Sequence, residues 1–158
     1  MRLYYDLHLH SCLSPCGDND MTPWNLVNMA KILGLDIIAL TDHNTCLNCP
    51  AFFKTAQANG IVPVAGMELT TAEDIHLVCL FEQLDDALKF SEKVNLRRIP
   101  FKNRVDIFGQ QMIMDENDEV IAFGLSLPGL GEAVQKSGGR LTPACLVLPF
   151  YIRFNACE

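Results

Sequence analysis

Four histidines and one glutamate are the residues in this sequence whose types best suit metal chemistry: His8, His10, His43, Glu68 and His76. Imidazole and carboxylate groups are ligands that Zn, Mn and Fe share, and a carboxylate can bridge two ions where a neutral imidazole cannot. Each residue alone has a simpler explanation, such as an exposed strand histidine or a solvated charge. Gathered at one end of a sheet, however, they would indicate a multinuclear hydrolytic centre.

The first predicted strand carries two of these histidines. Residues 3–10 alternate between apolar and polar, which predicts a strand. Leu7 and Leu9 then point to one face, and His8 and His10 point to the other. Both imidazoles are therefore expected on the same face.

Further strands and helices are predicted to position the remaining candidates. Three short apolar runs predict strands at residues 36–40, 61–65 and 75–81. Helices are predicted at residues 22–34, 50–59 and 84–94. Alternation of strand and helix predicts an α/β fold built from βαβ units with a parallel sheet or barrel. Polar residues at the carboxyl ends of such strands are site candidates, and Asp42, His43 and Glu68 lie at or just after such ends.

The pattern loosens after residue 97. A hairpin is predicted from residues 111–114 and 120–123, followed by a short helix at 130–137 and an apolar run at 144–152. That run is about half of the roughly 20 residues that cross a bilayer, so no membrane segment is predicted.

Composition restricts the partners of the chain. Its 158 residues, 49% hydrophobic and 20% charged, are typical of one globular domain over residues 1–158. Twelve Lys and Arg against nineteen Asp and Glu give a net charge of −7, which argues against stable binding to duplex nucleic acid. A phosphoester substrate would then need bound metal ions to neutralise it. Seven cysteines, and no apolar leader after Met1, predict reduced thiols in the cytoplasm.

Five motifs follow one another in residues 1–95: Asp6-Leu7-His8-Leu9-His10-Ser11, Asp18 in the next loop, Thr41-Asp42-His43-Asn44, Gly66-Met67-Glu68-Leu69-Thr70, and His76. Their order and spacing resemble the motifs of the PHP (polymerase and histidinol phosphatase) domain family. The combination is far more specific than any one motif.

The resemblance implies a fold and an activity. The fold would be a distorted, TIM-like (β/α) barrel with two or three Zn, Mn or Fe ions at the carboxyl ends of its strands. The activity would be hydrolysis of a phosphomonoester or phosphodiester, with a small phosphorylated compound or a nucleotide as the substrate.

The resemblance also implies metal ligands at six positions: His8, His10, Asp18, His43, Glu68 and His76. His8 and His10 would bind one ion and Glu68 would bridge, so that these residues and His43 form the catalytic set. Asp6 and Asp42 would lie behind the ligands and orient them.

The carboxyl-terminal part of the chain departs from the family pattern. The family usually has a histidine after Pro-Ala, where this chain has Cys145, which would be an alternative thiolate ligand. The last family motif, Asp-x-His, has no counterpart before Glu158. We therefore expect a barrel incomplete at the C-terminus that binds fewer ions than the full family. Its open edge would be covered by the hairpin region or by a partner chain in a homo-oligomer.

Two alternatives to a phosphoesterase follow from these departures. The chain could be a catalytically impaired or non-enzymatic metal-binding domain. More remotely, four cysteines could form a structural zinc site: Cys12, Cys16, Cys46 and Cys49.

Overall fold

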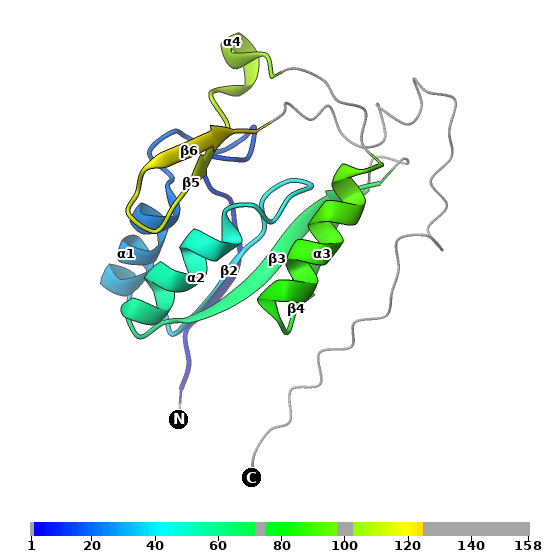
Figure 1. Cartoon of the computed structure of the whole chain (residues 1–158). Coiled ribbons are helices and arrows are strands. Elements are labelled where there is room, and N and C mark those ends of the chain that lie inside the picture. Colours follow the sequence, from blue (N-terminus) through cyan, green and yellow to red (C-terminus); the bar gives the residue numbers. More distant parts are fainter. Residues whose placement is uncertain (1, 72–74, 98–102, 125–158) are drawn as a thin grey trace.

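The computed structural model describes residues 2–71, 75–97 and 103–124, which contain one main sheet, a hairpin and four helices (Figure 1). The main sheet has the strands β1 (Tyr5–Leu9), β2 (Ile37–Leu40), β3 (Val62–Thr70) and β4 (His76–Phe81), in that order. The helices are α1 (Pro23–Leu33), α2 (Cys49–Ala58), α3 (Leu84–Asn95) and the short α4 (Val105–Phe108). The hairpin consists of β5 (Met112–Met114) and β6 (Val120–Phe123).

The sheet is only partly parallel. β1 pairs with β2, and β2 with β3, in parallel, as the βαβ pattern predicts. β4 runs antiparallel to β3, so the prediction of a wholly parallel sheet is wrong at this pair. Only five residues, 71–75, join the two strands, and a connection this short cannot carry a parallel crossover. β3 also extends to Thr70, which places Glu68 within the strand rather than after it.

Helix α1 begins and ends where its sequence signals predict. The Thr22 hydroxyl accepts a hydrogen bond from the Asn25 amide at 3.2 Å, and Pro23 occupies the first turn. Gly34 ends the helix in the left-handed conformation, at φ 71°, which glycine adopts without steric cost.

One face of the sheet packs against the helices. Phe52 of α2, Val27 of α1 and Val94 of α3 are buried in one core cluster with Leu40 and Met67 of the strands. Figure 1 shows these helices lying along the strands. Burial of these apolar side chains holds the strand ends in fixed positions, because a packed core resists deformation.

Strand β1 differs from the regular alternation that its sequence predicts. Leu9 packs against the helix-side core cluster, whereas Leu7 lines a hollow on the sheet. The pairing of β1 with β2 is irregular between Asp6 and Leu9, and this irregularity separates the two leucines.

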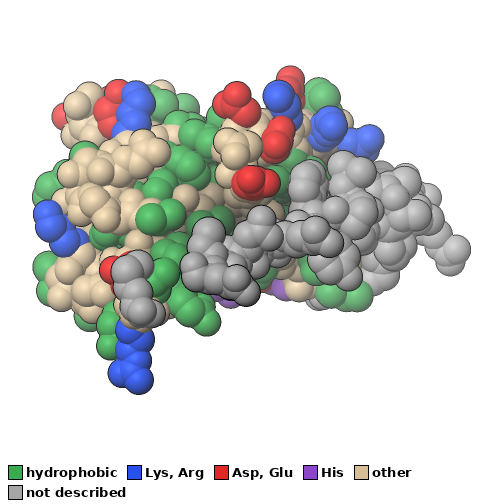
Figure 2. Space-filling model, turned by 90° about the horizontal axis from the view of Figure 1, so that it is seen from below, with side chains coloured by type: hydrophobic (Ala, Val, Ile, Leu, Met, Phe, Trp, Pro, Cys, Tyr) green, Lys and Arg blue, Asp and Glu red, His purple; other side chains and the backbone are tan. Residues whose placement is uncertain are grey.

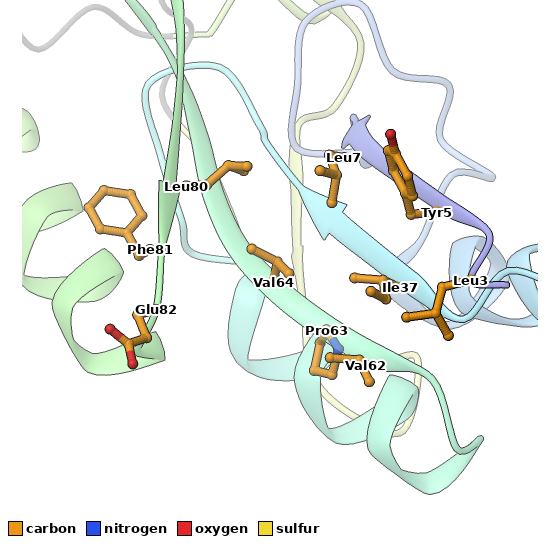
Figure 3. A pocket seen from close by; sticks show the side chains of 10 residues that line it. All are labelled: Leu3, Tyr5, Leu7, Ile37, Val62, Pro63, Val64, Leu80, Phe81 and Glu82. Atoms are coloured by element: carbon orange, nitrogen blue, oxygen red, sulfur yellow. The ribbon is translucent and has the colours of Figure 1, made fainter. Parts of the chain in front are cut away.

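The other face of the sheet forms an apolar hollow of about 590 Å³ (Figure 3). Its lining includes Leu7 of β1, Ile37 of β2, Val64 of β3 and Leu80 of β4. Ile37 faces this hollow while the next residue, Ile38, belongs to the core, as the alternation of a strand requires. The described strands thus form an open sheet with two apolar faces.

The predicted hairpin is confirmed, and it lies against the loops that follow β1 and β2. Buried Asn48 donates to the Met112 carbonyl at 3.1 Å and accepts from the Met114 amide at 2.9 Å. The Met112 amide donates to the Cys12 carbonyl at 3.1 Å. The helix predicted at 130–137, the apolar run at 144–152 and Cys145 lie outside the described residues. Among the residues that are described, no helix combines the length and apolar character needed to cross a membrane.

Candidate metal centre

The sheet brings the four histidines to the side chain of Glu68. His8 lies in β1 and His10 directly follows it, while His43 follows β2. Glu68 lies in β3, and His76 is the first residue of β4. Because β4 is antiparallel, its first residue lies at the same edge of the sheet as the carboxyl ends of the other strands.

The Glu68 carboxylate faces different histidines with its two oxygens. Oε2 lies 2.8 Å from His8 Nε2, 2.9 Å from His10 Nε2 and 3.9 Å from His43 Nε2. Oε1 lies 2.5 Å from His76 Nδ1. Glu68 is therefore shared by two groups with the spacing of metal ligands, one with His8 and His10 and one with His43 and His76.

Backbone hydrogen bonds fix the spacing between His43 and Glu68. The two residues form a parallel bridge that continues the pairing beyond β2. The Asn44 amide donates to the Glu68 carbonyl at 2.9 Å, and the Glu68 amide donates to the Asp42 carbonyl at 3.1 Å. The pairing of the strands therefore determines the distance between the backbone positions of His43 and Glu68.

Buried Asp42 orients the loop behind the histidines. Its carboxylate accepts hydrogen bonds from the Ser11 amide at 2.7 Å, the Ser11 hydroxyl at 2.6 Å and the Ser14 hydroxyl at 2.7 Å. Burial raises the pKa of Asp42, although the hydrogen bonds from Ser11 and Ser14 oppose the shift.

Ser14 determines which nitrogen of His10 carries a proton. The Ser14 hydroxyl gives its single proton to Asp42 and accepts from the His43 amide at 3.1 Å. The contact of 3.1 Å between Ser14 Oγ and His10 Nδ1 therefore needs a proton on Nδ1. This hydrogen-bond pattern indicates that neutral His10 is protonated on Nδ1. Its Nε2 atom then has a free lone pair.

The free lone pair of His10 makes the site suitable for a cation. His10 Nε2 faces Glu68 Oε2 at 2.9 Å, and a carboxylate oxygen also has only lone pairs to offer. Two acceptors at this distance repel each other unless a positive centre lies between or beside them. Nitrogen and carboxylate oxygen together are a donor set that suits Zn, Mn or Fe.

Burial and neighbouring charges shift the pKa values of the carboxylate and of two imidazoles in this cluster. Burial by itself raises the pKa of Glu68, but hydrogen bonds from His8 and His76, and the positive charge that His43 and His10 carry when protonated, together lower it to about 2. Burial lowers the pKa of both His10 and His43, and in each case neighbouring histidines lower it further. An ionised carboxylate and neutral imidazoles are the forms that bind metal ions.

The site is open to solvent on one side. The side chains of His8 and His76 are about half exposed, at 50% and 49%, whereas that of Glu68 is 8% exposed. Figure 2 shows histidine side chains reaching the surface at one edge of the view, beside hydrophobic ones. A ligand could therefore approach the histidines while the carboxylate beneath them stays buried.

Among the described residues, the predicted carboxylates Asp6 and Asp18 belong to no potential metal-ligating group. Asp18 is exposed, its carboxylate accepts from the Asp20 amide at 3.0 Å, and it belongs to none of the potential metal-ligating groups among the described residues. Asp6 accepts from the His8 amide at 3.1 Å and so contacts the backbone of a histidine. The assignment of Asp18 as a ligand stays a prediction.

The sequence analysis did not include Ser11 and Ser14 among the site residues, and it considered Cys16 only as a ligand of the four-cysteine zinc site. Ser11 and Ser14 bind Asp42, and Cys16 forms a potential metal-ligating group with His10 and His43. The signal for them was their position: all three lie in the loop that directly follows the His8-x-His10 pair.

The structure does not assemble the four-cysteine zinc site. Cys12, Cys46 and Cys49 are buried and Cys16 is exposed. Among the described residues, only Cys16 of the four belongs to a potential metal-ligating group. Burial raises the pKa of Cys12 to about 12, which keeps this thiol protonated.

Comparisons with known proteins give relatives that include an exoribonuclease and a DNA polymerase. The chain is 35% identical over 79 residues to a 5'-3' exoribonuclease of Haemophilus influenzae, covering 48% of this chain and 28% of that protein. It is 36% identical over 77 residues to an error-prone DNA polymerase of Symbiobacterium thermophilum, covering 49% and 7%. It is 29% identical over 102 residues to an uncharacterized protein of Methanocaldococcus jannaschii, covering 60% and 59%. The chain thus spans less than two thirds of the length of each of these relatives.

A solved structure and a family match complete the comparison. The crystal structure of a proposed metal-dependent phosphoesterase from Bifidobacterium adolescentis has a TM-score of 0.49 and 26% identity, covering 61% of this chain and 34% of that one. Residues 6–134 match the PHP domain, a range that contains all four histidines and Glu68. The chain belongs to the PHP domain family.

Proposed function

We propose that this chain is a metal-dependent phosphoesterase that hydrolyses a phosphomonoester or a phosphodiester. The observation that carries the proposal is the convergence of four histidines on the two oxygens of one buried carboxylate. A relative named as an exoribonuclease adds support for a nucleotide or nucleic-acid end as the substrate.

The proposed ligands divide into two groups that share Glu68. His8 and His10 would hold one ion through Nε2, with Oε2 of Glu68. His43 and His76 would hold a second ion, with Glu68 as the bridge. Zn, Mn and Fe fit these donors. Asp18, and Cys145 in place of the family's histidine, would be further ligands of the centre.

The chain's own residues prepare the site in three ways. Ser14 keeps the proton of His10 on Nδ1, so that Nε2 is free to bind. The lowered pKa of Glu68, about 2, keeps its carboxylate ionised even in mildly acidic solution. When bound, divalent ions supply the positive charge that neutralises a phosphate and lower the pKa of a water molecule. His8 and His76, half exposed, leave the site open to a substrate.

We also propose that residues 1–158 form one PHP-type domain and that its open sheet is part of a TIM-like barrel. The open sheet order β1-β2-β3-β4, with helices packed on one face, supports this proposal. The apolar hollow on the other face corresponds to the side that a barrel would enclose.

Metal analysis of the purified chain tests the proposed centre. We expect one or more Zn, Mn or Fe ions per chain, and we expect Glu68→Ala to remove them because both groups lose their shared ligand. Glu92→Ala, which removes an exposed carboxylate of α3, is the matched control and should keep the metal. A folded, metal-free wild-type chain would contradict the proposal.

Turnover separates the enzyme from a metal-binding domain. With metal bound, p-nitrophenyl phosphate and bis(p-nitrophenyl) phosphate test monoesterase and diesterase activity. Hydrolysis of either ester by the wild type, lost in Glu68→Ala, is the expected result. Bound metal with no hydrolysis of either ester would instead favour a catalytically impaired or non-enzymatic metal-binding domain.

A further inference from the structure

We propose that Cys16 is a thiolate ligand of the metal centre, acting with His10 and His43, and that it makes the centre favour Zn²⁺ over Mn²⁺. The proposal rests on the proposed metal-dependent function, since it adds a ligand to the same centre. Cys16 is the one exposed cysteine among those that the structure describes.

The geometry of three side chains from the segments that follow β1 and β2 supports this assignment. One ligand atom each of His10, Cys16 and His43 lies within 4.8 Å of the others. The two imidazole rings stack with their centroids 4.6 Å apart, which places both on the same side of the site. His10 also belongs to the group with His8 and Glu68, and His43 to the group with Glu68 and His76. Cys16 therefore shares one histidine with each of the two groups that contain Glu68.

The loop that carries Cys16 is held in place by the same contacts that orient the histidines. The Gly17 amide donates to the Ser14 carbonyl at 2.9 Å, and a Cβ atom at Gly17 would lie 2.1 Å from the Ser11 carbonyl oxygen. The Ser14 hydroxyl contacts both His10 and the His43 amide. The position of Cys16 is thus fixed relative to the two imidazoles rather than left to a free loop.

Ligand chemistry gives the metal preference. Two imidazoles and a thiolate are borderline-soft donors that suit Zn²⁺, whereas Mn²⁺ prefers carboxylate and water oxygens. When the sulfur binds the ion, the thiol proton leaves to solvent. The nearby carboxylate Asp18 would favour harder ions, but it belongs to none of the ligating groups in the part of the chain that the structure describes.

Cobalt substitution tests the sulfur ligand directly. Co²⁺ bound by a thiolate shows intense sulfur-to-cobalt charge-transfer absorption in the near ultraviolet, which imidazole and carboxylate ligands do not produce. We expect this band on titrating the metal-free wild-type chain with Co²⁺, and we expect Cys16→Ser to abolish it. Cys79→Ser, at a half-buried cysteine of β4 outside the ligating groups, is the matched control and should keep the band. In competition dialysis, Cys16→Ser should also lower the ratio of bound Zn²⁺ to bound Mn²⁺.

The outcomes distinguish this proposal from the proposed function. Co²⁺ that binds the wild type without a charge-transfer band, and is lost in Glu68→Ala, would overturn the role of Cys16 and leave the Glu68 centre intact. A band that persists in Cys16→Ser would likewise assign the sulfur to another cysteine. No Co²⁺ or Zn²⁺ binding to the wild type would overturn both proposals. Absence of the band from the wild-type spectrum would overturn the role of Cys16 even if the Cys16→Ser variant failed to fold.

Discussion

Ser14 connects the buried Asp42 carboxylate to the candidate ligand His10. Its hydroxyl donates a hydrogen bond to Asp42 and accepts one from the Nδ1–H group of His10. An oriented imidazole binds metal better because its lone pair needs no reorganisation, and losing such a partner typically lowers metal affinity about 10- to 100-fold.

The first prediction concerns Ser14→Ala. We expect Zn²⁺ affinity to fall by about 10- to 100-fold, since His10 loses the acceptor that fixes its tautomer. Isothermal titration calorimetry of the metal-free chain with Zn²⁺ measures this affinity. Ser91→Ala is the control, because the Ser91 hydroxyl is also buried and accepts from a backbone amide, that of Cys46, away from the histidines. Equal affinities in wild type and Ser14→Ala would show that Ser14 does not position His10.

The second prediction concerns pH. The pKa values of His10 and His43 are lowered in the folded chain, so the unfolded chain takes up protons at a higher pH than the folded one. The free energy of unfolding of the metal-free chain should therefore fall as the pH falls from about 6.5. The pKa of Glu68 is about 2, so its own contribution is lost only at lower pH, between its ordinary value and 2.

Urea unfolding at several pH values between 7 and 5 measures this dependence. In the double variant His10→Gln, His43→Gln the dependence should be weaker, because two of the groups that resist protonation are gone. A pH dependence as steep as in the wild type would show that other groups cause it.

At the scale of residues, the sequence predicted the ligands better than their surroundings. His8, His10, His43, Glu68 and His76 are predicted from type and position, and the structure brings them together. Ser14 and Cys16 were not predicted as part of this site, because their roles depend on how the loop after β1 folds back. That folding depends on Asp42, which lies 28 residues beyond Ser14 in the sequence.

At the scale of elements, the antiparallel pairing of β3 and β4 decides the place of His76. In a parallel fourth strand, the first residue would lie at the opposite edge of the sheet, far from Glu68. The pairing Thr70↔His76 instead places His76 next to the end of β3. The sequence predicts the strand itself, but the apolar run that identifies it is the same for either direction.

Gly66 allows β3 to lie close to the end of β2. A Cβ atom at this position would lie 2.7 Å from Thr41 Cγ2 and 3.0 Å from the Leu40 carbonyl oxygen. Glu68 is two residues further along the same strand, so a displacement of Gly66 would also move the shared ligand.

The third prediction concerns Gly66→Ala. We expect the free energy of unfolding to fall by about 1–3 kcal/mol, as overpacking usually costs, and Zn²⁺ affinity to fall with it. Gly60→Ala is the control: Gly60 has φ 73° with nothing near its Cβ position. Backbone strain in this variant should lower the free energy of unfolding by about 1 kcal/mol and leave Zn²⁺ affinity unchanged. Urea unfolding and metal titration of both variants measure the two effects. Unchanged Zn²⁺ affinity in Gly66→Ala would show that the close contact of β3 with β2 at Gly66 does not affect metal binding.

At the scale of the whole molecule, Asn48 joins the hairpin to the sheet and the site loop. Its side chain is fully buried and bonds to the Ser11 hydroxyl at 2.9 Å as well as to Met112 and Met114. The sequence predicts the hairpin, but this attachment links residues more than sixty positions apart and leaves no local pattern.

The fourth prediction concerns Asn48→Ala. We expect the free energy of unfolding to fall by about 2 kcal/mol or more, because buried backbone groups of β5 lose their partners. Hydrogen exchange should show faster exchange of the Met114 amide. Asn28→Ala is the control, because the Asn28 side chain donates to the Trp24 carbonyl at an exposed position of α1 and makes no other hydrogen bond to the described residues. Its effect should therefore stay within about 0.5 kcal/mol. Protection of Met114 as strong as in the wild type would contradict the prediction.

The resemblance implies a barrel, whereas the described residues form an open sheet of four strands. The unbroken apolar run of β2 predicts two apolar faces, and both are present: one against the helices and one lining the hollow. Whether a sheet closes depends on strand number, tilt and register together, which no single apolar run determines.

The sharing of Glu68 has a consequence for how the sheet assembles. All four strands of the main sheet, or the residues directly after them, contribute a candidate ligand, and all of these ligands meet at one carboxylate. A slip of one residue in any strand would turn its ligand to the opposite face. A bound ion would therefore stabilise only the native register of all four strands at once, so the metal centre would act as a check on correct strand alignment during folding.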